Sequence, residues 1–277
     1  MTQDRSMDEL IRDVEELMRL VAKEEILSRF GQLQHSDIKA KARPTDFVTI
    51  ADLEAEVRMI EGLAKLLPGS LFVGEEETYR DETVLDRLQG DKPVWTIDPL
   101  DGTNNFAKGK ACFTTICALI QNGETQMGWI LDPVADVCAT VKRGEGVFIN
   151  GRAVTFDPPT QVSDMTGSLG DMMRPKVQLR MQEGEVGLPR HLLRHHCCGR
   201  EYLDVLVGKL HFIHYGGALY PWDHAAGQLM MEEIGAYSRY RRRKTPYDPV
   251  EGAKGGDLFI APSEKTFNAL AERLFKE

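Results

Sequence analysis

The chain has 277 residues, 42% of them hydrophobic and 28% charged, so it is long enough to bury a large core in one domain or in two packed halves. Its formal net charge of −9 argues against a nucleic acid polymer as a partner, although bound cations can reverse the field locally where a phosphorylated small molecule binds. No stretch approaches the roughly 18 apolar residues of a membrane-spanning helix, and residues 1–10 lack the apolar run of a signal peptide.

The cysteines favour a reducing, cytoplasmic location. Their number is odd, and none of them forms a CxxC pair with the spacing of a zinc site. Free thiols are the rule in the cytoplasm, where disulfides are rare. The five are Cys112, Cys117, Cys138, Cys197 and Cys198.

The first part of the chain predicts helices followed by a β-rich meander. Apolar residues at helical spacing mark the helices, and Thr49 with Asp52 forms a capping-box pattern at the start of one of them. The pair Asn122-Gly123 is a hairpin signal between two apolar runs. In chain order we expect one or two helices over 6–30, a loop or hairpin over 39–46, a helix over 49–67, and strands over 71–73, 93–97, 113–121, 126–132, 137–142, 146–150 and 153–155.

The second part alternates between strands and helices. Pro158-Pro159 marks the boundary, so we predict an N-terminal subdomain over 1–157 and a C-terminal one over 158–277. We expect strands over 166–169, 210–215, 236–240 and 257–260, and helices over 171–183, 199–208, 222–234 and 263–275. This order predicts mixed sheets packed with helices, in an α/β or α+β fold.

Residues 95–106 read WTIDPLDGTNNF, which places two carboxylates, Asp98 and Asp101, at the end of an apolar strand. Carboxylate oxygens are ligands that Mg²⁺ prefers, and a buried carboxylate is costly without a partner. The Gly102-Thr103 step predicts a helix start whose backbone N–H groups favour a phosphate. Metal ligands and an anion site within one short stretch indicate metal-assisted chemistry on a phosphate.

Other acidic residues also stand at the ends of predicted elements. Asp46 precedes a short apolar run, and Asp223 stands at the start of a helix. Glu75 and Glu76 follow a strand and a glycine. Each of them alone also fits a structural role, because aspartate is a favoured N-cap residue and a glutamate cluster commonly faces solvent. Together with the carboxylates of residues 95–106 they favour a metal centre.

Four ordered motifs resemble the signature sequences of the inositol monophosphatase family. They are DFVTIAD at 46–52, GEE at 74–76, WTIDPLDGT at 95–103 and WDHAAG at 222–227. The family belongs to a superfamily of lithium-sensitive, Mg²⁺-dependent phosphatases. The resemblance implies a layered αβαβα sandwich, a homodimer, and two or three Mg²⁺ ions per subunit.

The resemblance also gives roles to single residues. Thr103 and Asp46 match the pair that orients and deprotonates the attacking water, and Glu76 matches an acid that supports the metal site. The metal ligands that the resemblance implies are Glu75, Asp98, the backbone carbonyl of Leu100, Asp101 and Asp223.

The region that would contact the substrate departs from the family pattern. Cys197 and Cys198 stand where the family has a small hydroxyl residue and an alanine. The acid that recognises inositol hydroxyls would fall near His214 or Tyr215, and neither is acidic, so these residues do not predict how inositol itself would be recognised. The residues expected to bind phosphate or substrate are Gly102, Thr103, Cys197, Cys198 and His214.

Two further features fit more than one interpretation. His195 and His196 could contact a phosphate or an alcohol, or could face solvent. The basic run RYRRRK at 239–244 could attract a second anionic group, as on a bisphosphate or a nucleotide, or could form a solvated hairpin.

We therefore predict a Mg²⁺-dependent phosphomonoesterase that hydrolyses a small alcohol or sugar phosphate, similar to an inositol phosphate, with metal-activated water. The alternatives are a bisphosphate or nucleotide phosphatase, a histidinol-phosphate phosphatase, and a phosphatase-like protein that binds without catalysis. The complete acidic set argues against the last, because a site without a function is not expected to keep carboxylates that repel one another.

Overall fold

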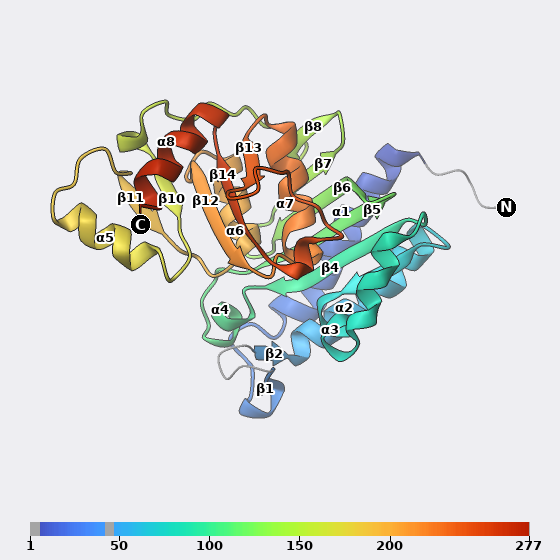
Figure 1. Cartoon of the computed structure of the whole chain (residues 1–277). Helices are drawn as coiled ribbons and strands as arrows, with labels where there is room; N and C mark the ends of the chain where they lie inside the picture. The colour runs from blue at the N-terminus through green and yellow to red at the C-terminus, as the bar shows by residue number, and fades with distance from the viewer. Residues whose placement is uncertain (1–5, 42–46, 277) are drawn as a thin grey trace.

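Two β-sheets form the framework of the protein (Figure 1). The computed structural model describes residues 6–41 and 47–276. Within these ranges the larger sheet has seven strands in the order β3-β4-β5-β6-β7-β8-β9, parallel between β3 and β4 and antiparallel elsewhere. They are β3 Leu71–Gly74, β4 Val94–Asp101, β5 Thr114–Gln121, β6 Glu124–Asp132, β7 Val137–Lys142, β8 Gly146–Ile149 and β9 Arg152–Ala153.

The second sheet is mixed and, in the described part of the chain, has five strands in the order β11-β10-β12-β14-β13. They are β10 Thr166–Ser168, β11 His191–Leu193, β12 Phe212–Gly217, β13 Tyr237–Tyr240 and β14 Gly256–Ala261. β10 pairs in parallel with β11 and β12, whereas β14 pairs antiparallel with β12 and β13. A separate antiparallel pair joins β1 Ile38–Ala40 to β2 Phe47–Thr49.

Helices cover both sheets and also fill the space between them (Figure 1). They are α1 Met7–Val21, α2 Ile50–Leu66, α3 Glu75–Arg80, α4 Thr103–Ala107, α5 Arg174–Gln182, α6 Cys198–Leu206, α7 Pro221–Glu233 and α8 Glu264–Leu274. One hydrophobic core joins α1 and α2 to the large sheet, a second joins both sheets through α6 and α7, and a third joins α5 and α8 to the outer face of the second sheet. The order of layers is therefore αβαβα, and the predicted layered sandwich is confirmed.

Two short elements, β11 and α3, were not expected from the sequence pattern. β11 and α3 span three and six residues, which is too short for a hydrophobic period to show. The predicted helical segment over 6–30 is α1, which continues directly into a π-helix over Ala22–Leu27. Short 3₁₀-helices cover His35–Asp37, Glu82–Gln89, Val162–Asp164 and Gly252–Lys254.

None of the helices in the described ranges combines the length and the apolar character needed to cross a bilayer. The division into two subdomains at residue 157 stays a prediction. Residues from both sides of this boundary share the core between the sheets, for example Ile116 and Ile213.

Candidate metal centre

Two of the predicted carboxylates lie at the buried end of β4. Asp98 and Asp101 are 2% and 8% exposed. The pairing of β4 with β5 shifts register between them, and such a bulge re-aims the side chains of a strand. Oδ1 of Asp98 accepts a hydrogen bond from the Leu100 amide at 2.9 Å. Gly102 follows at φ 91°, a left-handed conformation that glycine adopts without strain, and it directly precedes α4.

Glu75 and Glu76 begin α3 at the same edge of the large sheet. β3 runs parallel to β4, so the chain leaves both strands at one edge, beside Asp98. The amides of Glu76 and of the next residue donate to the Glu56 carboxylate of α2 at 2.8 and 2.9 Å, which satisfies the first turn of α3. Gly74 permits this approach, because a Cβ there would lie 2.4 Å from Glu56 Oε2.

Asp223 reaches the same place from the second half of the chain. It lies in the first turn of α7, and its carboxyl group is hydrogen-bonded to that of Asp98. Burial raises the pKa of both groups well above the usual range, and the charges of Glu75 and Asp101 raise it further. Crowded oxygen donors that resist ionisation together are a set that hard divalent cations such as Mg²⁺ would neutralise, so these residues fit the implied metal.

A lysine outside the predicted set also enters the cluster. Lys41 Nζ lies 2.7 Å from Glu76 Oε1 and forms a second ion pair with Glu75. Burial lowers the pKa of Lys41, but the two carboxylates outweigh this effect and raise it. Burial also raises the pKa of Glu76, to about 7, with a further contribution from the Glu75 charge. An ammonium group therefore already neutralises part of the acidic cluster.

The Thr103 hydroxyl finds its carboxylate partner in Asp52. It donates towards Asp52 Oδ1 and towards the Leu100 carbonyl, both at 2.9 Å. Oδ2 of Asp52 accepts from the Thr49 amide at 2.8 Å and from the Thr49 hydroxyl at 2.6 Å, which is the predicted capping box at the start of α2. Burial raises the pKa of Asp52 to about 7. Asp46, which we expected to pair with Thr103, lies outside the described residues.

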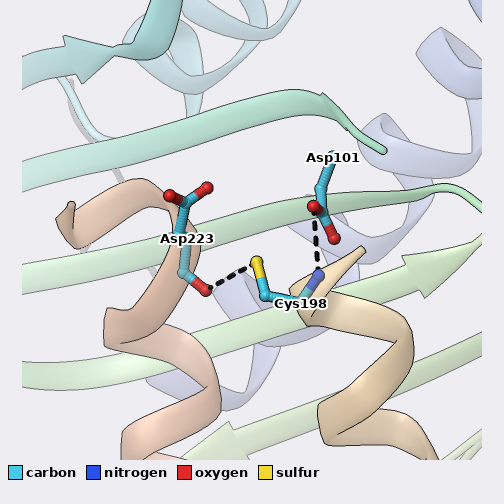
Figure 2. Close-up of side chains that lie close together, drawn as sticks. All are labelled: Asp101, Cys198 and Asp223. Carbon is cyan, nitrogen blue, oxygen red and sulfur yellow. Dashed lines mark hydrogen bonds between the residues drawn. The ribbon is translucent and has the colours of Figure 1, made fainter. Parts of the chain in front are cut away.

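Asp101 connects the two halves of the site through the first turn of α6. Its Oδ2 accepts from the Gly199 amide at 2.7 Å and from the Thr114 hydroxyl at 2.9 Å, and Cys197 Sγ lies 3.0 Å from the same oxygen. Its Oδ1 accepts from the Cys198 amide at 3.2 Å. Figure 2 shows Cys198 at the start of α6, between Asp101 and Asp223.

Both cysteines at the start of α6 therefore border the carboxylates. One ligand atom each from Asp101, Cys198 and Asp223 lies within 4.8 Å of the other two. Cys198 Sγ also lies 3.5 Å from the Asp223 carbonyl oxygen, to which it donates (Figure 2).

The expectation that His214 contacts the substrate is corrected by its position in β12. Its Nε2 is hydrogen-bonded to Asp257 Oδ1 at 2.7 Å, and its ring packs on Phe275 with the centroids 4.7 Å apart. Phe275 belongs to the outer core beyond the second sheet, whereas Tyr215 faces the inner core and donates to the Cys198 carbonyl at 3.4 Å. Successive side chains of a strand point to opposite faces of the sheet. His214 therefore points away from the site, which lies on the face that Tyr215 occupies.

The basic run over 239–244 packs on aromatic rings at the edge of the second sheet. Arg241 Nη2 donates to Asp257 Oδ2 at 2.6 Å, and its guanidinium lies 4.2 Å from the Phe275 ring centroid. Arg243 stacks 4.0 Å from the ring centroid of Tyr240. These contacts with neighbouring side chains favour the hairpin interpretation of the run over a second anion site.

The sequence matches the model of the inositol monophosphatase family over residues 6–269. The chain belongs to the inositol monophosphatase family. A curated relative named inositol-1-monophosphatase, from Rhizobium meliloti, is 32% identical over 221 residues, which cover 76% of this chain and 77% of the relative. Members of the inositol monophosphatase family are phosphoric monoester hydrolases.

Solved structures of the inositol monophosphatase fold superpose over nearly the whole chain. A staphylococcal IMPase-I complexed with products gives a TM-score of 0.80 at 18% identity and covers 99% of this chain and 97% of that one. An IMPase/NADP phosphatase complexed with Mg²⁺ and phosphate gives a TM-score of 0.79 at 20% identity and covers 98% and 95%. At these levels of sequence identity, the structural similarity establishes the fold alone.

Proposed function

We propose that this protein hydrolyses a small alcohol phosphate of the inositol phosphate type in a metal-dependent reaction. The observation that carries the proposal is the convergence of carboxylates from three separate elements at one point between the two sheets. The family match supports the reaction class, and its named relatives support the substrate class.

The proposed ligands would hold two or three Mg²⁺ ions. Bound cations would neutralise the charge of the phosphate and activate a water molecule. Asp101 accepts three hydrogen bonds on Oδ2 but one on Oδ1, so Oδ1 is the oxygen better placed to face a cation. The ligands we propose are Glu75, Asp98, the carbonyl of Leu100, Asp101 and Asp223.

Thr103 and Asp52 would move the proton of the attacking water. The hydroxyl of Thr103 has two acceptors at 2.9 Å and lone pairs with which it can orient a water molecule. Because the pKa of Asp52 is about 7, its carboxylate can accept a proton near neutral pH. We assign to this pair the part that the sequence motif gave to Thr103 and Asp46. Glu76, held by Lys41, would position Glu75 rather than touch the substrate.

Further expectations rest on the family. We propose a homodimer in the cytoplasm, inhibition by millimolar lithium, and phosphate contacts from the backbone of Gly102 and Thr103. Cys197 and Cys198 border Asp101 and would shape the place of the leaving alcohol.

Phosphate release from a panel of substrates tests the proposal. The panel holds inositol, histidinol and sugar phosphates together with NADP and 2'-AMP, because solved neighbours carry NADP phosphatase and 2'-AMP in their titles. We expect turnover with Mg²⁺, none with EDTA, and a loss of at least about a hundredfold in Asp98→Asn and Asp223→Asn with the circular dichroism spectrum unchanged. Asp91→Asn, at an exposed position, is the matched control. Turnover that persists in EDTA would contradict the proposal, and no turnover on any substrate would favour a binding protein.

A further inference from the structure

A group of thiols lies beside the carboxylates but outside the proposed metal ligands. Cys112 stands in the loop between α4 and β5, and His195 stands between β11 and α6. Asn105 of α4 ties these two segments together, because its Nδ2 donates to the carbonyls of Cys112 and His195, both at 2.9 Å. A buried amide therefore holds the two segments against each other.

Cys112 is part of a hydrogen-bonded chain that ends on a carboxylate. Its thiol interacts with the Cys197 thiol and with the His195 imidazole. His195 Nε2 lies 2.9 Å from Asp204 Oδ2 of α6. The hydrogen bonds from Cys197 and then His195 lower the pKa of Cys112 to about 5, while Asp204 and then Cys112 raise the pKa of His195 to about 10.

The ionisation and accessibility of Cys112 are those of a reactive thiol. These shifts favour a thiolate beside an imidazolium, and the thiolate is the nucleophilic form of cysteine. Cys112 is half-buried, and the His195 side chain is 27% exposed, so a small oxidant can approach. Cys117 differs from Cys112 in accessibility and in thiol pKa, because it is fully buried and burial raises the pKa of its thiol.

Cys197 lies between this thiolate and the candidate metal centre. It is 2% exposed, and its Sγ lies 3.0 Å from Asp101 Oδ2. A Cβ on Gly102 would lie 2.9 Å from the Cys112 carbonyl oxygen and 3.2 Å from Cys197 Cβ, so both cysteines flank the same glycine. The packing around Gly102 therefore brings a half-buried cysteine next to a fully buried one whose thiol touches Asp101.

We propose that Cys112 and Cys197 form a thiol–disulfide switch, driven by hydroperoxides, that acts on the adjacent carboxylate cluster. The Cys112 sulfur attacks a peroxide oxygen, the O–O bond breaks, and the departing hydroxide takes a proton from His195 and leaves as water. Cys197 sulfur then attacks the sulfenic acid, and the hydroxyl group leaves as a second water with the Cys197 proton. Two thiols and one hydrogen peroxide thus give a disulfide and two waters, and a dithiol reductant reverses the change.

Disulfide formation would alter the site in two ways. Asp101 would lose the thiol that now donates to its Oδ2, and the start of α6 would be tied covalently to the loop at residue 112. The step from oxidation to activity rests on the proposed function, whereas formation of the disulfide does not.

Peptide mapping by mass spectrometry after treatment with stoichiometric hydrogen peroxide tests the bond itself. We expect a Cys112–Cys197 disulfide in the unmodified sequence, a sulfenic acid trapped by dimedone at Cys112 in Cys197→Ser, and neither product in Cys112→Ser. Cys198→Ser is the matched control, and it should form the disulfide. His195→Gln should slow oxidation by at least about tenfold, since the thiolate loses its cationic partner. Oxidation that falls equally on Cys117 or Cys198 would overturn the assignment.

Activity on the substrate panel tests the coupling. Oxidised protein should lose at least about fivefold of its Mg²⁺-dependent turnover and regain it with dithiothreitol, while Cys112→Ser should match the untreated protein before and after peroxide. A disulfide that leaves turnover unchanged would overturn the coupling to the carboxylates. If the reduced protein shows no turnover at all, the proposed function fails while the peptide map still decides the switch.

Discussion

Asp52 divides its two carboxylate oxygens between two tasks. One oxygen closes the capping box of α2, and the other accepts from the Thr103 hydroxyl. The first task fixes the side chain in a single orientation, so the second oxygen faces Thr103 without further loss of conformational entropy. A helix cap thus positions a group for proton transfer.

Replacement of this acid separates two candidates for the proton acceptor. We expect Asp52→Asn to lower kcat by about a hundredfold to a thousandfold with little change in KM, because an amide cannot accept the proton. The amide oxygen of asparagine can still accept from the Thr49 amide in the capping box, so the melting temperature should fall by no more than a few degrees. Asp46→Asn is the matched variant and should keep most of the activity. If Asp46→Asn is the inactive one, the proton acceptor has been assigned to the wrong residue.

At the scale of residues, the sequence reveals an acid more easily than it reveals what the acid does. The spacing of Thr49 and Asp52 predicts the capping box, which is one of the two roles of Asp52. The other depends on the position of α4, 51 residues further along the chain, which no local pattern encodes. Lys41 was missed for the same reason, because a single lysine within a predicted loop or hairpin carries no sign that it will be buried against Glu76.

At the scale of elements, Asp257 of β14 joins three segments of the second sheet. It binds His214 of β12 at 2.7 Å and Arg241, just beyond β13, at 2.6 Å. Burial opposes the ionisation of Asp257, but the hydrogen bonds from His214 and Arg241 outweigh it and hold its pKa at about 2. The charge of one side chain therefore links β12 and the segment after β13 to β14.

The lowered pKa gives a stability that depends on pH. The Asp257 carboxyl ionises more readily in the folded protein than in the unfolded one. Its contribution to the free energy of unfolding is therefore complete above the unfolded pKa near 4 and is lost as the pH falls towards 2. We expect Asp257→Asn to lower the free energy of unfolding at pH 7 by about 1–2 kcal/mol, since solvent screens part of the interaction. The difference between the two proteins in urea unfolding should shrink below pH 4. A difference that stays constant down to pH 2.5 would contradict this account.

Most long elements of the fold follow from the sequence, whereas pairing partners and short elements do not. The hairpin at Asn122-Gly123 is β5 and β6, because a two-residue turn of this type fixes its own strands. β12 was also predicted, but the side of the sheet on which His214 lies depends on register, and register is set by distant strands. The meeting of Asp223 with Asp98 could be expected from the family motifs but not from spacing, since 125 residues separate them.

At the scale of the molecule, the packing of two sheets against a shared pair of helices concentrates negative charge. Burial, and then the charges of Glu75 and Asp101, raise the cost of ionising Asp98 and Asp223 at the contact between the halves. The folded state without cations therefore carries an electrostatic penalty that the unfolded chain avoids.

Mg²⁺ should thus stabilise the whole protein. A ligand at about 100 times its Kd stabilises the folded state by about 2.7 kcal/mol, which for a chain of this size is a rise in Tm of about 5 °C or more. We expect this rise on addition of Mg²⁺ to EDTA-treated protein in differential scanning calorimetry, and a much smaller one in Asp223→Asn. In EDTA the variant should be at least as stable as the unmodified protein, because one repelling carboxylate is gone. NaCl at equal ionic strength is the control, and an equal effect of NaCl would refute a specific site.

The hydrogen bonds from the start of α6 to Asp101 also have a consequence for synthesis. The donor at Cys198 follows Asp101 by 97 residues. A ribosome therefore synthesises the acidic end of β4 long before the backbone amides that donate hydrogen bonds to Asp101. During this interval the nascent chain holds its carboxylates without the helix terminus that stabilises them. Cations would then bind tightly only to chains whose second half has already packed against the first. Tight metal binding would therefore indicate that folding is complete.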